Sequence, residues 1–372
     1  MGITYLRGRA SESRSGNVKS GSMEKVCKFW AEGRCVRRGR CQFLHSWSRG
    51  DLYSYLANLH GHTKAVTGLA LPDSGSGDKL YTTSYDGKLC IWDCHTGKTT
   101  AVINFGVPVG CLINEGPWLF IGLPNQIKVW NTQNNTTTGP EITITLDEEG
   151  PVGQVNCMAV VNGTLFAGTE SGQILAWQAS SDGASPTANP IFIPLGVPSS
   201  MKHGGPVVCL CYGGNRLFSA SLDHSIKVWD YNLQCVATLK GHSDGVMSLA
   251  FGGYYLVSSS LDGTIKIWAT TEKGNIETVH THEEGHGVLA LNGITLPPKT
   301  CDAKEKEESD DQNSILLCSC NDNSVRLYAL PSFEEKGRFF TTQEVRTIQK
   351  GPGGHIFTGD GSGRTTVWKM NL

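Results

Sequence analysis

The stretch Gly241–Trp268, GHSDGVMSLAFGGYYLVSSSLDGTIKIW, sets the pattern for most of the chain. It begins with Gly-His, passes through two apolar runs with strand-like alternation, turns at Asp-Gly and ends at Trp after a further apolar run. Alternation around an Asp-Gly turn is typical of β-hairpins. The stretch therefore predicts antiparallel strands of one small sheet.

The second half of this stretch recurs six more times in one frame. Each copy ends at an aromatic residue, and the successive end-points are 38, 47, 52, 39, 60 and 40 residues apart: Trp92, Trp130, Trp177, Trp229, Trp268, Tyr328 and Trp368. A period near 40 residues with Gly-His and Trp-Asp signatures resembles the WD40 repeat, in which each unit is one four-stranded blade. The resemblance implies an all-β fold, a seven-bladed WD40 β-propeller.

The last repeat ends at Trp368, and only four residues follow it. These are too few for an outer strand. The segment Tyr53–Leu59, which precedes the first Gly-His, is the candidate for that strand. Because an unpaired sheet edge invites aggregation, we expect this segment to close the ring, with the propeller covering residues 51–372.

The repeat also contains His242, a Ser in LVSSS, Asp262 and Trp268, and the first repeat has an equivalent set. In WD40 proteins such residues form a buried hydrogen-bond network, whereas a catalytic triad would not be copied from blade to blade. Three repeats lack Asp at this turn and have Asn125, Ser171 and Ser362 instead. Because the network lacks its Asp there, we expect these three blades to be held together less firmly. Since no phosphate-binding or dinucleotide motif is present either, we expect no enzyme, no catalytic residues and no small-molecule substrate.

Residues 23–48 contain Cys27, Cys35, Cys41 and His45 in the spacing C-x7-C-x5-C-x3-H. This spacing resembles the CCCH zinc finger. Three thiolates and one imidazole suit tetrahedral zinc, so we expect these four residues to bind one structural Zn²⁺. The segment has few apolar residues, and metal binding would supply most of its folding free energy.

Cations and aromatic rings lie between the ligands. Flat rings on which bases stack, beside cations that attract phosphates, are typical of single-stranded nucleic-acid sites. The candidate contacts are Lys28, Phe29, Trp30, Arg34, Arg37, Arg38, Arg40 and Phe43. The family resemblance implies that Phe43, two residues after the third Cys, stacks on a base, with Phe29 or Trp30 in a similar role. One of these rings, Trp30 above all, could instead pack against the zinc core.

Charge is unevenly distributed along the chain. Residues 1–60 hold 11 Lys and Arg against 4 Asp and Glu, and residues 61–372 hold 21 against 30. A basic arm on an acidic body indicates an anionic partner at the arm. We expect disorder over residues 1–22 and a solvated acidic loop at 299–313, within the sixth blade. Thirteen Cys without a secretory signal indicate a reducing, intracellular compartment, and no run is long enough to span a membrane.

Residues 25–372 as a whole resemble plant proteins that join one CCCH finger to a seven-bladed WD40 propeller. The resemblance implies zinc-dependent binding of nucleic acid, with RNA ahead of DNA, a propeller that recruits protein partners, and location in the nucleus rather than the cytoplasm. One alternative is a WD40 scaffold or ubiquitin-ligase substrate receptor in which the finger is secondary. No Arg follows the blade aromatics by three residues, which weakens that alternative. Another is a DNA-binding regulator, although the finger is too short to present a long groove-reading helix.

Overall fold

The computed structural model describes residues 25–72, 79–133, 142–146, 152–180, 190–196, 202–230, 232–272, 274–295 and 314–371. The predicted disordered segment 1–22 and the predicted acidic loop 299–313 lie outside these residues. The chain divides into two compact units, Met1–His45 and Ser46–Leu372. No helix within the described ranges has the length and apolarity needed to cross a membrane.

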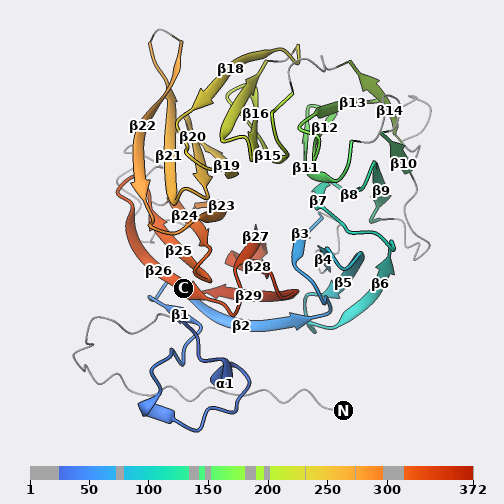
Figure 1. The fold of residues 1–372 in the computed structure, drawn as a ribbon. Helices are drawn as coiled ribbons and strands as arrows, with labels where there is room; N and C mark the ends of the chain where they lie inside the picture. The colour runs from blue at the N-terminus through green and yellow to red at the C-terminus, as the bar shows by residue number, and fades with distance from the viewer. Residues whose placement is uncertain are drawn as a thin grey trace, which may run out of the picture. The chain divides into compact units, whose positions relative to one another are not determined.

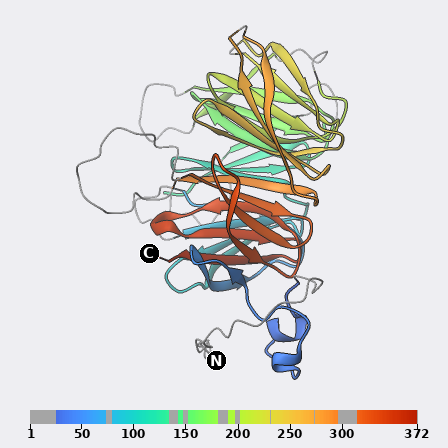
Figure 2. The same cartoon turned by 90° about the vertical axis from the view of Figure 1, so that its left-hand side faces the viewer.

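The second unit is a propeller of seven antiparallel sheets, as the repeat pattern predicts. The innermost strands, β3, β7, β11, β15, β19, β23 and β27, surround the centre of the ring (Figure 1). The strands run from one face of the ring to the other (Figure 2). The prediction of an all-β, seven-bladed fold is confirmed.

Blades 1 to 5 follow the chain in order, each with four strands. Blade 1 comprises β3 (Val66–Ala70), β4 (Lys79–Ser84), β5 (Lys88–Asp93) and β6 (Thr99–Asn104). Blade 2 comprises β7 (Cys111–Glu115), β8 (Trp118–Leu123), β9 (Gln126–Asn131) and β10 (Ile142–Thr145). Blade 3 comprises β11 (Val155–Val161), β12 (Thr164–Thr169), β13 (Ile174–Ser180) and β14 (Ile191–Leu195). Blade 4 comprises β15 (Val207–Gly213), β16 (Arg216–Ser221), β17 (Ser225–Trp229) and β18 (Cys235–Lys240). Blade 5 comprises β19 (Val246–Gly252), β20 (Tyr255–Ser260), β21 (Thr264–Thr270) and β22 (Ile276–Glu283).

Blades 6 and 7 both include strands from the start of the unit. Blade 6 comprises β23 (Val288–Thr295), β24 (Ser314–Cys320), β25 (Ser324–Ala329) and β26 (Glu334–Phe340), with β1 (Ser48–Arg49) as a fifth strand on β26. Blade 7 comprises β27 (Val345–Lys350), β28 (Ile356–Asp360) and β29 (Arg364–Met370), with β2 (Tyr53–His60) as its outer strand. A short 3-10 turn, η4 (Pro352–Gly354), joins β27 to β28.

The β2–β29 pairing closes the ring. It runs antiparallel from Tyr53 opposite Met370 to His60 opposite Arg364, with one irregularity between Tyr55 and Ala57. Aromatic rings fill the core behind it: Phe339 of blade 6 stacks on Trp368 of blade 7 at 4.1 Å between ring centroids. Buried Tyr53 meets the edge of Phe339. Packing across the seam therefore adds to the strand pairing.

Blade 5 shows how buried polar groups hold a blade together. The Trp268 indole N–H donates to Ser258 Oγ at 2.8 Å, Ser258 contacts His242 Nε2 at 2.8 Å, and His242 Nδ1 lies 2.9 Å from the Asp262 carboxylate. Asp262 in turn accepts from the backbone N–H of Ser243. Blades 1 and 4 repeat the arrangement with His62, Thr82, Asp86 and Trp92 and with His203, Ser219, Asp223 and Trp229. Each chain of bonds ties the loop before a blade to the turn between its second and third strands, so a structural reading accounts for these residues.

The blades without Asp at the predicted position use other ties. In blade 2, Asn125 Oδ1 accepts from the backbone N–H groups of Val152 and Gly153, both at 2.9 Å. In blade 3, Thr169 Oγ1 bonds to Ser171 Oγ at 3.0 Å. In blade 7, Trp368 still donates to Thr358 Oγ1 at 2.9 Å. Each of these three blades therefore keeps at least one side-chain hydrogen bond, although the residues that form it differ from blade to blade.

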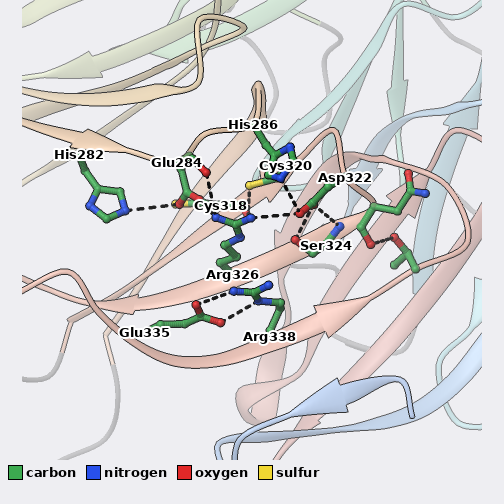
Figure 3. A network of polar contacts seen from close by, with 12 residues as sticks. His282, Glu284, His286, Cys318, Cys320, Asp322, Ser324, Arg326, Glu335 and Arg338 are labelled. Atoms are coloured by element: carbon green, nitrogen blue, oxygen red, sulfur yellow. Dashed lines mark hydrogen bonds and ion pairs between the residues drawn. The ribbon is translucent and has the colours of Figure 1, made fainter. Parts of the chain in front are cut away.

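Blade 6 replaces the usual network with an ionic one (Figure 3). Glu284 precedes β23 by the same interval as His242 precedes β19, and its side chain is completely buried. Arg326 forms an ion pair with Glu284 and a second one with Asp322 at 3.0 Å. Tyr328 takes the place of the tryptophan, and burial, together with nearby Glu284, raises its pKa. A buried carboxylate needs a compensating charge, and Arg326 provides it for Glu284. Arg326 also links Glu284 to Asp322, as the imidazole of His242 links Ser258 to Asp262 in blade 5.

We predict that Arg326→Met lowers the free energy of unfolding by roughly 3–5 kcal/mol, because Glu284 would then be buried without its counter-charge. Urea denaturation followed by tryptophan fluorescence measures the loss. Lys266→Met is the matched control, since Lys266 has the same place in blade 5 but, within the described residues, bonds to the Thr281 hydroxyl at 3.2 Å and forms no ion pair. Equal losses of stability in the two variants would contradict the ionic role of Arg326. Glu284→Gln combined with Arg326→Met should recover part of the stability, because no unpaired buried charge then remains.

Acidification should also destabilise the propeller. Burial lowers the pKa of His62, His203 and His242 below the ordinary value of 6.5. The folded state therefore resists protonation that the unfolded chain accepts, and stability present above about pH 6.5 is lost as the pH falls through that value. The denaturation midpoint should be lower at pH 5.5 than at pH 7.5, and His242→Gln should shrink the difference. A midpoint that does not change with pH would refute this account.

Candidate zinc centre and nucleic-acid interface

The first unit is a short loop-rich segment with one turn of helix. Helix α1 (Lys28–Ala31) begins directly after Cys27, whose carbonyl accepts from the Ala31 N–H at 2.9 Å. Gly33 then takes a left-handed conformation, with φ of 71°, which ends the helix. A 3-10 turn, η1 (Arg38–Arg40), precedes Cys41. Residues 26 and 44 form a β-bridge that brings the two ends of the segment together.

This fold gathers the four predicted ligands. One ligand atom from each of Cys27, Cys35, Cys41 and His45 lies within 4.8 Å of all the others, and among the described residues this is the one such cluster. His45 Nε2 is buried and has no hydrogen-bond partner within the described part of the chain. A buried imidazole nitrogen without a partner, facing three thiols, fits a Cys3His metal site.

Backbone groups favour ionisation of the first thiol. Burial alone would raise the pKa of Cys27, but the N–H groups of Trp30 and Phe29 and the thiols of Cys41 and Cys35 lower it below its ordinary value. Zinc binds thiolates, so amides that stabilise the charged sulfur prepare the site for a metal. Sequence reasoning did not identify these donors, because only the tight turn after Cys27 directs them at the sulfur.

The three predicted aromatic contacts separate into two groups. Trp30 stacks on His45, with ring centroids 5.6 Å apart and planes 10° apart, so its ring belongs to the core of the finger. Phe29 is 59% exposed and Phe43 is 42% exposed. Both rings are therefore open to a ligand.

The predicted cationic contacts lie on the surface of the finger. Lys28, Arg34, Arg37 and Arg40 are exposed, and the Arg38 side chain lies outside the described residues. Arg34 forms an ion pair with Glu32. The remaining cations surround a module with few acidic groups, which gives it the positive field that a phosphate backbone requires.

Comparison with known proteins agrees with both parts of the molecule. The WD domain, G-beta repeat family matches residues 53–93, 197–230 and 233–269. The crystal structure of the WD40 β-propeller domain of Doa1 matches 85% of this chain and 96% of its own, with a TM-score of 0.63 and 18% identity. The fold and the Cys3His cluster together define a class of protein, the CCCH zinc finger proteins with a WD40 propeller.

Two plant proteins resemble nearly the whole chain. Zinc finger CCCH domain-containing protein 17 of Oryza sativa subsp. japonica is 49% identical over 93% of this chain and 73% of its own length. Zinc finger CCCH domain-containing protein 48 of Arabidopsis thaliana is 50% identical over 96% of this chain and 76% of its own length. The chain belongs to this family of zinc finger CCCH domain-containing proteins.

We predict that the purified chain binds one zinc ion and that His45→Ala or Cys35→Ser loses it, because a tetrahedral site cannot hold the metal tightly with a ligand removed. Elemental analysis of the metal per chain is the measurement. Cys94→Ser is the control, since Cys94 is an exposed thiol of blade 1 and its loss should leave the zinc content unchanged. Retention of zinc by both ligand variants would exclude this site.

Proposed function

We propose that this protein binds single-stranded RNA through its zinc finger and recruits protein partners through its propeller, without catalysing a reaction. The observation that carries the RNA proposal is the pair of exposed rings, Phe29 and Phe43, on a cationic Cys3His module. When bound, one zinc ion would hold Cys27, Cys35, Cys41 and His45 in a fixed arrangement and so set the positions of the rings. Its role is structural.

The two rings would stack on unpaired bases. Stacking does not require a particular base, because every base has a flat π face. Phe43 immediately precedes the Leu44 backbone, whose N–H and carbonyl pair with Lys25 and Cys27, so its Cα position is anchored. Phe29 lies in α1 next to the core ring of Trp30. A base held by these rings therefore meets a surface that is ordered before binding.

The exposed cations would provide attraction to phosphates. Within the described residues, Glu32 pairs with Arg34, and Lys28, Arg37 and Arg40 form no ion pair, so their charges remain available to phosphates. Binding that releases counterions weakens as salt rises. Duplex DNA is a poorer fit, because stacking needs unpaired bases and the four-residue helix α1 is too short to read a groove.

The propeller would serve as the scaffold. It has seven rigid blades, and the family resemblance and matches identify it as a WD40 domain. Its buried His, Ser or Thr, and Asp residues are used in structural networks, which supports a binding role over a catalytic one. The finger would select the RNA, and the propeller would select the proteins that act on it.

The test is binding of a fluorescent pool of random 12-nucleotide RNA to the full chain, measured by anisotropy. Phe43→Ala should weaken binding by roughly 5- to 150-fold, the equivalent of the 1–3 kcal/mol that stacking of one base contributes. Chelation of zinc should abolish it. Affinity should fall steadily as salt is raised.

Val36→Ala is the matched control, because Val36 is 91% exposed in the same module but has no ring for stacking. It should bind RNA as the unmodified chain does. The proposal fails if Phe43→Ala binds as tightly as Val36→Ala, or if duplex DNA of the same length binds more tightly than single-stranded RNA.

A further inference from the structure

A cavity of about 580 Å³ lies at the centre of the ring, and none of the features above uses it. The innermost strand of every blade (Figure 1) contributes to its lining at or beside its first residues, from Val66 of β3 to Arg346 of β27. Three turns between second and third strands, at Tyr85, Glu170 and Leu222, also line it. Its size is that of ordinary ligand pockets. This cavity is called the channel mouth here.

Apolar side chains of three neighbouring blades line one side of the channel mouth. Leu222, Met247 and Leu289 contribute from blades 4, 5 and 6. Leu261 holds the turn position in blade 5 that Leu222 holds in blade 4, and the two are 36% and 39% exposed. A Cβ at Gly245 would lie 2.8 Å from Leu222 Cδ2 and 3.7 Å from Leu261 Cδ1. Both leucines therefore lie beside the same glycine and form one apolar patch.

The turns that carry the two leucines are held in place before any partner binds. The Leu222 N–H donates to the Pro206 carbonyl at 3.0 Å, and the Leu261 N–H donates to the Gly245 carbonyl at 3.0 Å. The next residue in each turn is the aspartate that bonds to the buried histidine of its blade. A patch that is already ordered loses little entropy when a partner covers it.

Charges at the channel mouth indicate which kind of partner would cover the patch. Two charged side chains line the cavity, Glu170 of blade 3 and Arg346 of blade 7. Arg346 is paired with Glu344 at 2.7 Å. Glu170 accepts a hydrogen bond from the Gln154 N–H at 3.1 Å but, across the described ranges, has no ion-pair partner. The lining thus has one uncompensated negative charge, which attracts a cation and repels the phosphates of a nucleic acid.

The turn with Glu170 adjoins the apolar patch. Glu170 holds the turn position in blade 3 that Leu222 holds in blade 4. Two residues later, Gly172 packs on the loop before β15, where an added Cβ would lie 2.9 Å from the Gly205 carbonyl oxygen. A Cβ at Gly205 would in turn lie 3.5 Å from the Leu222 carbonyl carbon. The turn with Leu222 therefore has the turn with Glu170 on one side and the turn with Leu261 on the other.

We propose that the channel mouth binds a segment of a protein partner that presents an Arg or Lys to Glu170 and an aliphatic side chain to the leucines and Met247. This inference rests on the scaffold role proposed above and gives that role a place and a chemistry. The aliphatic side chain would remove the apolar patch from water, and exclusion of water would strengthen the attraction between the cation and Glu170.

The experiment is selection of a phage-displayed library of random 12-residue peptides on the full chain, followed by anisotropy with the labelled consensus peptide. Enriched peptides should combine Arg or Lys with Leu, Ile, Val or Met. Glu170→Lys should weaken binding about tenfold or more, and it should prefer a peptide whose cation is replaced by Glu. Leu222→Ala should weaken binding about tenfold, as expected for a central apolar contact.

Two further variants separate loss of contact from loss of fold. Glu170→Gln removes the charge but keeps an oxygen that can accept from the Gln154 N–H, so it should weaken binding about threefold to fivefold without changing the melting temperature. Glu115→Lys is the matched control for Glu170→Lys, since Glu115 is exposed at the opposite end of inner strand β7. It should leave peptide binding unchanged. The proposal is overturned if the enriched peptides lack Arg and Lys, or if Glu115→Lys weakens binding as much as Glu170→Lys.

The same measurements separate this inference from the functions proposed above. Peptides that bind the Glu170 and Leu222 variants as tightly as the unmodified chain would exclude the channel mouth and leave the scaffold role intact. Failure to enrich any peptide would overturn both. Phe43→Ala should leave peptide binding unchanged, and Leu222→Ala should leave RNA binding unchanged. RNA that displaces the peptide from Phe43→Ala would assign the channel mouth to nucleic acid and overturn the proposal.

Discussion

The propeller depends on one constraint, that a polar group withdrawn from water must find a partner. The buried indole of Trp268 needs an acceptor, Ser258 provides it, and the imidazole of His242 and the carboxylate of Asp262 continue the chain to the backbone of the preceding loop. Each of these hydrogen bonds fixes the position of a backbone segment that hydrophobic packing alone would leave free to shift. Burial of polar groups thus gives each blade one arrangement rather than several.

Blade 6 satisfies the same constraint with opposite charges. Glu284 takes the place of the neutral imidazole, and its ion pair with Arg326 takes the place of the hydrogen bonds that the imidazole makes in the other blades. The two positions depend on each other because the buried carboxylate would otherwise lack a counter-charge. Nearby histidines extend this site: His282 Nε2 lies 3.6 Å from Glu284, and His286 Nε2 lies 3.7 Å from Asp322. Two carboxylates, one guanidinium and two imidazoles therefore lie close together in this site.

Some of these features can be predicted from the sequence, whereas others depend on contacts that only the folded chain creates. The period of the aromatic end-points predicts seven blades, because each unit repeats the same hairpin register. Ligand spacing predicts the Cys3His cluster, because the short loops leave the four side chains few other arrangements. In contrast, Glu284 and Arg326 look like ordinary surface charges until the fold brings them together. Likewise, Phe29 and Trp30 are adjacent in sequence, and only the orientation of α1 decides which ring packs on His45 and which meets solvent.

Closure of the ring by β2 has a consequence for synthesis. Asn58 of β2 accepts a hydrogen bond from Thr366 of β29, 308 residues later in the chain. The earlier strand therefore leaves the ribosome long before its partner exists, and its edge stays unpaired while six other blades are made. Loop closure over such a distance is slow, and an open strand edge can pair with other chains in the meantime. The native partner of Tyr53–His60 is thus among the last parts of the ring to be made, and this edge can pair wrongly until then.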